Sequence, residues 1–235
     1  MLHNKVLLLL FFFSSRLFIV FSSAERSSFK ISVPPSTDVW RTPITNRFNA
    51  STHLLLSSGP VPLKSFNRTR ITFSANWTTL FDQGGILLHL TPSKSAKPAS
   101  TGTSDPGFSD RWLKTGIEFN MDKPFLSTVG TYVYSDWSIV PTSETGGKTT
   151  IEVRREVDDT GTSLWVYQLV IGDDGKELQR NPLRQVTWFF AGEDEWLLDV
   201  RAMAARPASR EDVKGDKNLV VEFEGVEIDV GGVSH

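Results

Sequence analysis

The chain has 235 residues, with 25 Lys and Arg against 27 Asp and Glu, no Cys, and 39% hydrophobic residues. A chain of this length and composition is expected to form one globular domain. The formal net charge of −2 gives no basic surface for nucleic acid, and the lack of Cys excludes disulfides, thiolate metal sites and cysteine nucleophiles. Seven Trp and 16 Phe supply bulk for a large core or an aromatic-lined groove.

The first 24 residues have the features of a secretory leader. An apolar run follows Lys5, and small residues precede a cleavage point after Ala24. Arg16 interrupts the run, which is also shorter than a membrane-spanning helix, so we expect no stable membrane insertion. Two alternatives stay open: a signal peptide of a secreted protein, or an untranslated stretch wrongly joined to a cytoplasmic chain that starts near Ser28. The same choice decides whether the sequons at Asn49, Asn67 and Asn76 are glycosylated.

Apolar and polar residues alternate along most of the chain, which is the pattern of half-buried β-strands. The clearest case is residues 70–78, where Ile71, Phe73, Ala75 and Trp77 share one side. No window carries a helical stripe of apolar residues. Further strands are predicted at residues 86–90, 112–119, 128–134, 150–156, 163–171, 186–190 and 195–204.

Turn signals separate these strands. The sequence Gly172-Asp173-Asp174-Gly175 predicts a hairpin, because Asp and Gly tolerate the positive φ of tight connections. In the last strand the apolar positions change parity at Gly225, which predicts a β-bulge there. Residues 93–110 and 206–217 are predicted to be long loops. Many strands without helices predict an all-β fold, a sandwich or jelly roll of two antiparallel sheets.

The segment 112–119 carries the most informative polar side chains. Alternation places Trp112, Lys114, Gly116 and Glu118 on the face opposite to the core. The cation and the anion are ~13 Å apart along the strand, and Gly116 leaves a gap between them. This arrangement predicts a ligand platform. The alternative is that both charges pair with neighbouring strands and that Trp112 caps the core.

Three other pairs of residues are candidates for the same ligand-binding face, which we expect to be the concave face of a sheet. Asp82 and Gln83 precede two glycines, Asp136 and Trp137 join a carboxylate to an indole, and Arg184 shares a parity with Trp188. The structural alternatives are a turn cap for the first carboxylate and an internal ion pair for the arginine. The predicted ligand-binding set is Asp82, Gln83, Trp112, Lys114, Glu118, Asp136, Trp137, Arg184 and Trp188.

The sequence lacks the combinations of residues that catalysis or metal binding would need. Glycosidases use two carboxyl groups about 5–5.5 or 6.5–9.5 Å apart, and the only alternating pair, Glu222 and Glu224, has the pattern of a solvent-facing stripe. His53 and His89 are the only histidines away from the termini and do not make a metal site. We therefore expect a protein that is not an enzyme and that needs no cofactor or metal.

Six motifs follow one another in a recognisable order: Thr37-Asp38-Val39-Trp40-Arg41, residues 81–85, residues 112–118, residues 135–138, residues 164–167 and residues 184–188. This order resembles the fungal regulation-of-enolase family, a branch of a domain-of-unknown-function group. The resemblance covers residues 29–230. It implies a concanavalin-A-like lectin/glucanase jelly roll, a non-enzymatic binding or regulatory role, and enolase as a partner.

Related sandwiches occur attached to glycosidases. A secreted carbohydrate-binding module, with a glycan as its partner, is therefore the second hypothesis. A glycoside hydrolase is the third. In the first hypothesis, Lys114 and Arg184 are expected to hold a small anionic ligand.

Overall fold

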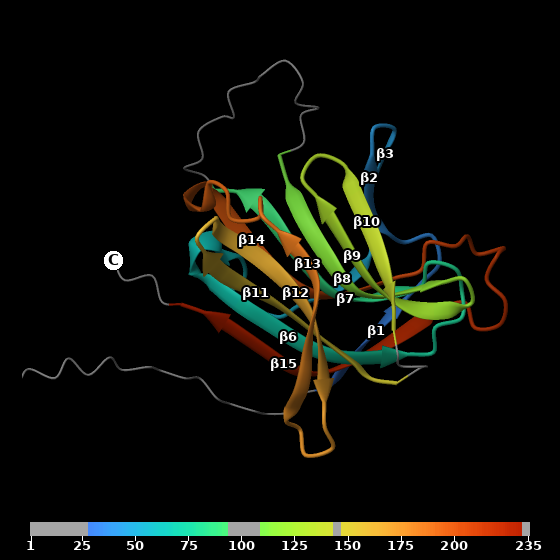
Figure 1. The fold of residues 1–235 in the computed structure, drawn as a ribbon. Coiled ribbons are helices and arrows are strands. Elements are labelled where there is room, and N and C mark those ends of the chain that lie inside the picture. The colour runs from blue at the N-terminus through green and yellow to red at the C-terminus, as the bar shows by residue number, and fades with distance from the viewer. Residues whose placement is uncertain (1–27, 94–108, 143–146, 232–235) are drawn as a thin grey trace, which may run out of the picture.

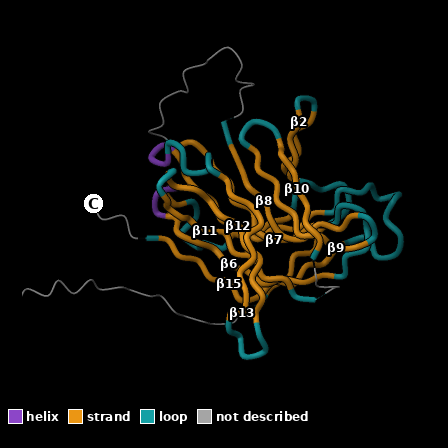
Figure 2. The backbone as a smooth tube through the Cα atoms, in the orientation of Figure 1, coloured by secondary structure: helices purple, strands orange, loops and turns teal. Residues whose placement is uncertain are grey.

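The computed structural model describes residues 28–93, 109–142 and 147–231. Two antiparallel sheets pack face to face, and the described residues contain only strands, loops and two short 3₁₀ turns (Figures 1 and 2). The predicted all-β sandwich is confirmed. Within these ranges, no helix has the length and apolar character needed to cross a bilayer. The leader, residues 1–24, lies outside the described residues.

One sheet has six strands and includes both the first and the last strand of the domain. It is antiparallel throughout, and β6 lies near its centre (Figure 1). Its strands are, in spatial order, β1 (Phe29–Val33), β15 (Leu219–Val230), β6 (Phe66–Ala75), β11 (Thr149–Asp158), β12 (Gly161–Ile171) and β13 (Glu177–Val186).

The second sheet has seven strands and carries the candidate site. Its order is β10 (Ser135–Pro141), β9 (Lys123–Thr131), β8 (Arg111–Asn120), β7 (Gln83–Pro92), β14 (Trp196–Ala205) and β4 (Ser51–Leu54), and β5 (Val61–Pro62) also pairs with β14. A separate hairpin, β2 (Val39–Thr42) with β3 (Thr45–Phe48), stands beside β10 (Figure 1). The 3₁₀ turns are η1 (Leu63–Ser65) and η2 (Glu193–Glu195).

The main core lies between the two sheets and is built from the alternating apolar residues. Ile71 and Phe73 of β6 are at most 1% exposed and meet Leu88 of β7 and Val200 of β14 there. A second, smaller buried cluster lies on the other face of the seven-stranded sheet, beside the β2–β3 hairpin. It consists of Val39, Leu87, Trp112, Met203 and Ala205. Both faces of this sheet are therefore partly covered.

The predicted hairpin turn and β-bulge are both present. The β12–β13 hairpin turns at residues 172–175, and the register of β15 shifts at Gly225, which has φ +60°. The strand predicted at residues 186–190 is wrong, because β13 ends at Val186 and the chain then turns. Phe189 and Phe190 fill the core there instead of pairing with a strand. Most of the loop predicted at residues 93–110 lies outside the described residues, whereas residues 206–217 form a loop with one isolated bridge.

Candidate functional site

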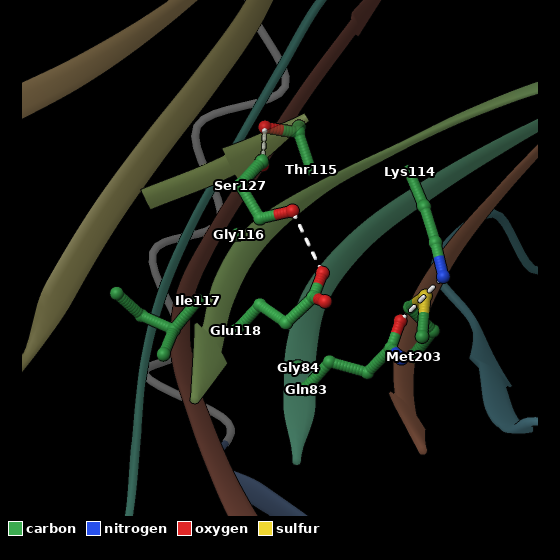
Figure 3. Close-up of a pocket in the computed structure, with 9 residues that line it drawn as sticks. All are labelled: Gln83, Gly84, Lys114, Thr115, Gly116, Ile117, Glu118, Ser127 and Met203. Atoms are coloured by element: carbon green, nitrogen blue, oxygen red, sulfur yellow. Dashed lines mark hydrogen bonds between the residues drawn. The ribbon is translucent and has the colours of Figure 1, made fainter. Parts of the chain in front are cut away.

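The outer face of the seven-stranded sheet, turned away from the main core, carries Lys114 and Glu118. Successive side chains of a strand point to opposite faces, so Leu113 and Ile117 enter the core while Lys114 and Glu118 do not. In Figure 3, the apolar side chain of Ile117 points away from the polar side chains of Glu118, Gln83 and Lys114. The predicted alternation along β8 is confirmed.

Two glycines face each other across β7 and β8 in the floor of this face. A Cβ atom on Gly116 would lie 2.0 Å from the carbonyl oxygen of Gly84, and Gly116 has φ +159°. Its partner Gly85 is equally constrained, with φ +153°. The close approach leaves a hollow of about 10 Å³ between Lys114 and Glu118, which is space for about one water molecule (Figure 3).

A larger cavity of about 260 Å³ adjoins this hollow. Trp137 and Phe81 are 38% and 37% exposed, so their rings remain accessible to a ligand. The cavity combines residues from five separate segments: residues 38–40 at the start of β2, residues 81–83 at the start of β7, strands β8 and β10, and the loop after β14. Its walls are Trp40, Phe81, Trp137 and Pro207, and its polar groups are Asp38, Gln83, Lys114 and Glu118.

Lys114 is buried but its charge is compensated. Its Nζ donates to Oε1 of Gln83 at 2.7 Å and to Oδ1 of Asp38 at 3.2 Å. Nε2 of Gln83 donates to the same Asp38 oxygen at 3.3 Å. Buried charges are tolerated when they are paired and hydrogen-bonded, and these contacts meet that condition. The ammonium group is therefore engaged by the protein itself.

Glu118 is buried without an ion pair among the described residues. Its Oε2 accepts hydrogen bonds from Oγ of Ser127 at 2.9 Å and from Nε1 of Trp137 at 3.2 Å, whereas Oε1 accepts none from that part of the chain. Burial raises the pKa of Glu118 above its ordinary value, although the charge of Lys114 and the two hydrogen bonds oppose the shift. This carboxyl group forms no ion pair with another described side chain, and the charge of Lys114 acts on it only at longer range.

Four of the predicted site residues line the cavity: Gln83, Lys114, Glu118 and Trp137. Trp112 shares their face, but it is completely buried. The guanidinium of Arg41 lies 4.0 Å from the centroid of the Trp112 ring, and Phe48 packs against its edge. The prediction that Trp112 stacks on a ligand is therefore wrong, because the β2–β3 hairpin covers this ring.

Asp82 does not reach the cavity. It precedes Gln83 directly, is fully buried, and accepts hydrogen bonds from Nε and Nη2 of Arg206, each at 2.7 Å. Its Oδ2 also accepts the backbone N–H groups of Thr78 and Thr79. The structure supports the alternative for Asp82, a turn cap that also anchors the loop after β14.

Asp136, Arg184 and Trp188 lie away from the cavity. Asp136 and Trp137 are consecutive on β10 and point to opposite faces. Arg184 donates to Oδ2 of Asp136 at 2.6 Å and to Ser138 at 2.8 Å, which links the edges of the two sheets. Trp188 packs against the core. The prediction that these three residues share a face with Lys114 is wrong.

Sequence reasoning did not place Asp38, Trp40, Phe81 or Pro207 in the site. The first two lie in a recognised motif and share a parity, but nothing local shows that they fold over β7 and β8. Phe81 has φ +65°, an unusual conformation for an aromatic residue, and its N–H donates to the carbonyl of Phe119 at 2.8 Å. No group of three or more metal-ligating side chains occurs in the described ranges.

The fold is a β-sandwich of two antiparallel sheets with a cavity on the outer face of one sheet. The family described as "Protein of unknown function (DUF1349)" matches residues 20–229, so the chain belongs to this family. It is 41% identical over 205 residues to the uncharacterized protein AN7484 of Emericella nidulans, and the match covers 87% of each chain.

Two solved structures are similar to this chain in fold. A functionally unknown protein from Saccharomyces cerevisiae superposes with a TM-score of 0.55 and 20% identity, covering 86% of this chain and 88% of that one. The alginate lyase from Klebsiella pneumoniae is similar with a TM-score of 0.46 and 12% identity, over 87% and 81% of the two chains. The prediction of an all-β sandwich of two antiparallel sheets is confirmed by the sheets of this chain, and the fold is similar to that of the Saccharomyces cerevisiae protein.

Proposed function

We propose that the chain is a non-enzymatic binding protein and that its ligand occupies the cavity bordered by Trp40, Phe81 and Trp137. The observation that carries this proposal is the combination of these aromatic walls with buried, hydrogen-bonded polar groups. Ligand sites are typically concave and mostly apolar, with a few polar groups that fix orientation. Lys114 and Gln83 are held in place by each other, so they are preorganised for such a role.

A thermal-shift screen of monosaccharides, amino sugars and small metabolites tests the proposal. A ligand of the cavity should raise the melting temperature of the wild-type protein, because binding to the native state alone stabilises it. Trp137→Ala should abolish the shift. Arg184→Ala is the matched control, because Arg184 lies outside the cavity, and it should retain the shift. A ligand that stabilises all three proteins equally would place the binding site elsewhere.

The carboxyl groups support a role without catalysis. A glycosidase needs a second carboxyl group that acts with the first across the scissile bond. Asp38, the other acid of the cavity, is bonded to Lys114 and Gln83. Glu222 and Glu224 lie on β15, in the other sheet, where they pair with lysines. We expect no glycan hydrolysis by the wild type, and Glu118→Gln should have no such activity to lose.

The family resemblance supports enolase as the protein partner. We propose that the chain binds enolase and changes its turnover. The test is capture of enolase from a fungal extract on the immobilised protein, together with an assay of enolase activity with and without the protein. If enolase is not enriched and its turnover does not change, the enolase hypothesis must be abandoned while the binding cavity remains.

Carbohydrate binding is the second candidate, and the half-exposed indole of Trp137 beside Glu118 favours it. Sugar-binding sites commonly stack an aromatic ring on the sugar and form hydrogen bonds to it with carboxyl and amide groups. A glycan array with wild type, Trp137→Ala and Arg184→Ala tests it. Retention of a glycan by the first and third proteins only would support this candidate. Trp112→Ala does not serve this purpose, because Trp112 is buried.

A further inference from the structure

The polar groups of the cavity carry one more acid than base. Two carboxyl groups, of Asp38 and Glu118, stand against one ammonium group, of Lys114. Lys114 bonds to Asp38 and Gln83, so its charge is compensated within the protein. Glu118 bonds only to the neutral donors Ser127 and Trp137 among the described residues. With both carboxyl groups ionised, the net charge of the polar groups of the cavity is negative.

This charge balance does not favour the small anionic ligand that the sequence suggested as a partner. Arg184 is bonded to Asp136 at the edge of the sandwich, so it adds no positive charge to the cavity. An anion in the cavity would face Glu118, which forms no ion pair with a described residue, and a Lys114 that already has partners. A cation would face Glu118, an acid that has no ion-pair partner among the described residues.

The aromatic walls favour a cation as well. The rings of Phe81 and Trp137 stand nearly perpendicular, at 80°, with centroids 6.4 Å apart. Trp40 already lies 5.9 Å from Nζ of Lys114, measured to the ring centroid. Aromatic faces attract ammonium groups, and the attraction is larger where water is excluded. Three such rings beside an unpaired carboxyl group form a suitable environment for a positively charged head group.

We propose that the cavity binds a small organic cation, with its ammonium group between the aromatic walls and Glu118 as its counter-ion. This inference rests on the proposed binding function and specifies the class of ligand. Oε1 of Glu118, which accepts no hydrogen bond from the described residues, is the acceptor for the ligand. Lys114, Asp38 and Gln83 form the polar floor and orient the hydroxyl groups of the ligand.

Two matched pairs of probes test the charge of the ligand directly. The first is choline and its neutral carbon isostere, in which a tert-butyl group replaces the trimethylammonium group. The second is glucosamine and glucose. Isothermal titration of the wild type at neutral pH and low salt should show each cation binding at least about tenfold more tightly than its neutral partner, because one cation–aromatic contact with a charged acceptor reaches that size.

Two variants locate the effect. Glu118→Gln keeps the size of the side chain and an oxygen acceptor but removes its charge, so it should lower the affinity for choline to that for the isostere. Arg184→Ala should leave both affinities unchanged. Amide spectra of each variant show whether it is folded, and the comparison of probes on the wild type needs no variant at all.

The outcomes separate this inference from the proposed function. Equal or tighter binding of the neutral probes, lost in Trp137→Ala, would overturn the cation inference and leave the binding function in place. A preference for the cations that survives in Glu118→Gln would also overturn it, because the charge would act elsewhere. If neither cation binds at millimolar concentration, the inference is wrong.

Discussion

Trp137 donates a hydrogen bond from its indole Nε1 to Oε2 of Glu118 at 3.2 Å, across the strand that lies between them. Ser127 of that intervening strand, β9, bonds to the same oxygen at 2.9 Å. The bond fixes the indole as a wall of the cavity and connects its position to the charge of the buried acid. The ring and the carboxyl group therefore act as one unit of the site.

Trp137→Phe should raise the pKa of Glu118 further. The indole N–H stabilises the ionised carboxylate, and a phenyl ring keeps the apolar wall but cannot donate. The measurement is an NMR titration of the Glu118 side-chain carboxyl carbon in wild type and variant. An unchanged or lower pKa in the variant would show that the hydrogen bond does not stabilise the charge.

Glu118→Gln should become more stable relative to the wild type as the pH rises. The native pKa of Glu118 lies above its unfolded value, so the native state binds more protons and the wild type loses stability between these two pKa values. The Gln variant has no such loss. Urea unfolding over a series of pH values measures the difference.

An exposed acid provides the control for that experiment. The pKa of Glu222 is lowered by a hydrogen bond from Lys30, so Glu222→Gln should not show the same gain at high pH. A parallel pH dependence in both variants would mean that burial of Glu118 is not the cause.

Arg206→Ala should destabilise the protein by about 3–5 kcal/mol, the usual cost of leaving a buried carboxylate without its partner. Arg206 is 2% exposed and bonds to both oxygens of the fully buried Asp82. Urea denaturation gives the free energy of unfolding. Lys64→Ala is the comparison, because its partner Asp194 is 80% exposed, and it should leave the midpoint nearly unchanged. Similar losses in both variants would contradict this role of burial.

Gly116→Ala should destabilise the protein by at least about 2 kcal/mol, because the new Cβ atom would lie 2.0 Å from a carbonyl oxygen of β7. Gly130→Ala is the control, because it makes the same replacement in the same sheet without a close contact. A Cβ atom on Gly130 meets only the Trp188 ring at 3.6 Å, which is an ordinary contact. Thermal unfolding of both variants should therefore separate them clearly. Equal melting temperatures would show that β7 and β8 can move apart.

The sequence predicted the strands whose two faces differ and missed those that lie at an edge. Residues 70–75 alternate because one side meets the core, and they form β6 as expected. The strand β13 is polar, contains Pro182 and lies at the edge of its sheet, so apolar alternation does not mark it. Trp188, Phe189 and Phe190 were predicted as part of a strand because aromatic residues are common in strands. In the structure they lie in a turn and pack into the core.

The sequence could place the site residues of one strand relative to one another, but not those that distant segments contribute. Alternation along one strand placed Lys114 and Glu118 together, because they are four residues apart. Alternation also separates Asp136 from Trp137, because consecutive residues of a strand face opposite sides, so the prediction that put both on one face was wrong. Asp38 and Trp40 reach the cavity through the packing of a hairpin onto a distant strand. No local pattern in one sequence encodes that contact.

The most direct test of the cavity is an NMR titration of the seven tryptophan indole N–H signals with choline. The account predicts that the signals of Trp40 and Trp137 shift, while those of the buried Trp112 and the core-packed Trp188 stay in place. Shifts confined to Trp112 or Trp188, with a stationary Trp137 signal, would contradict it.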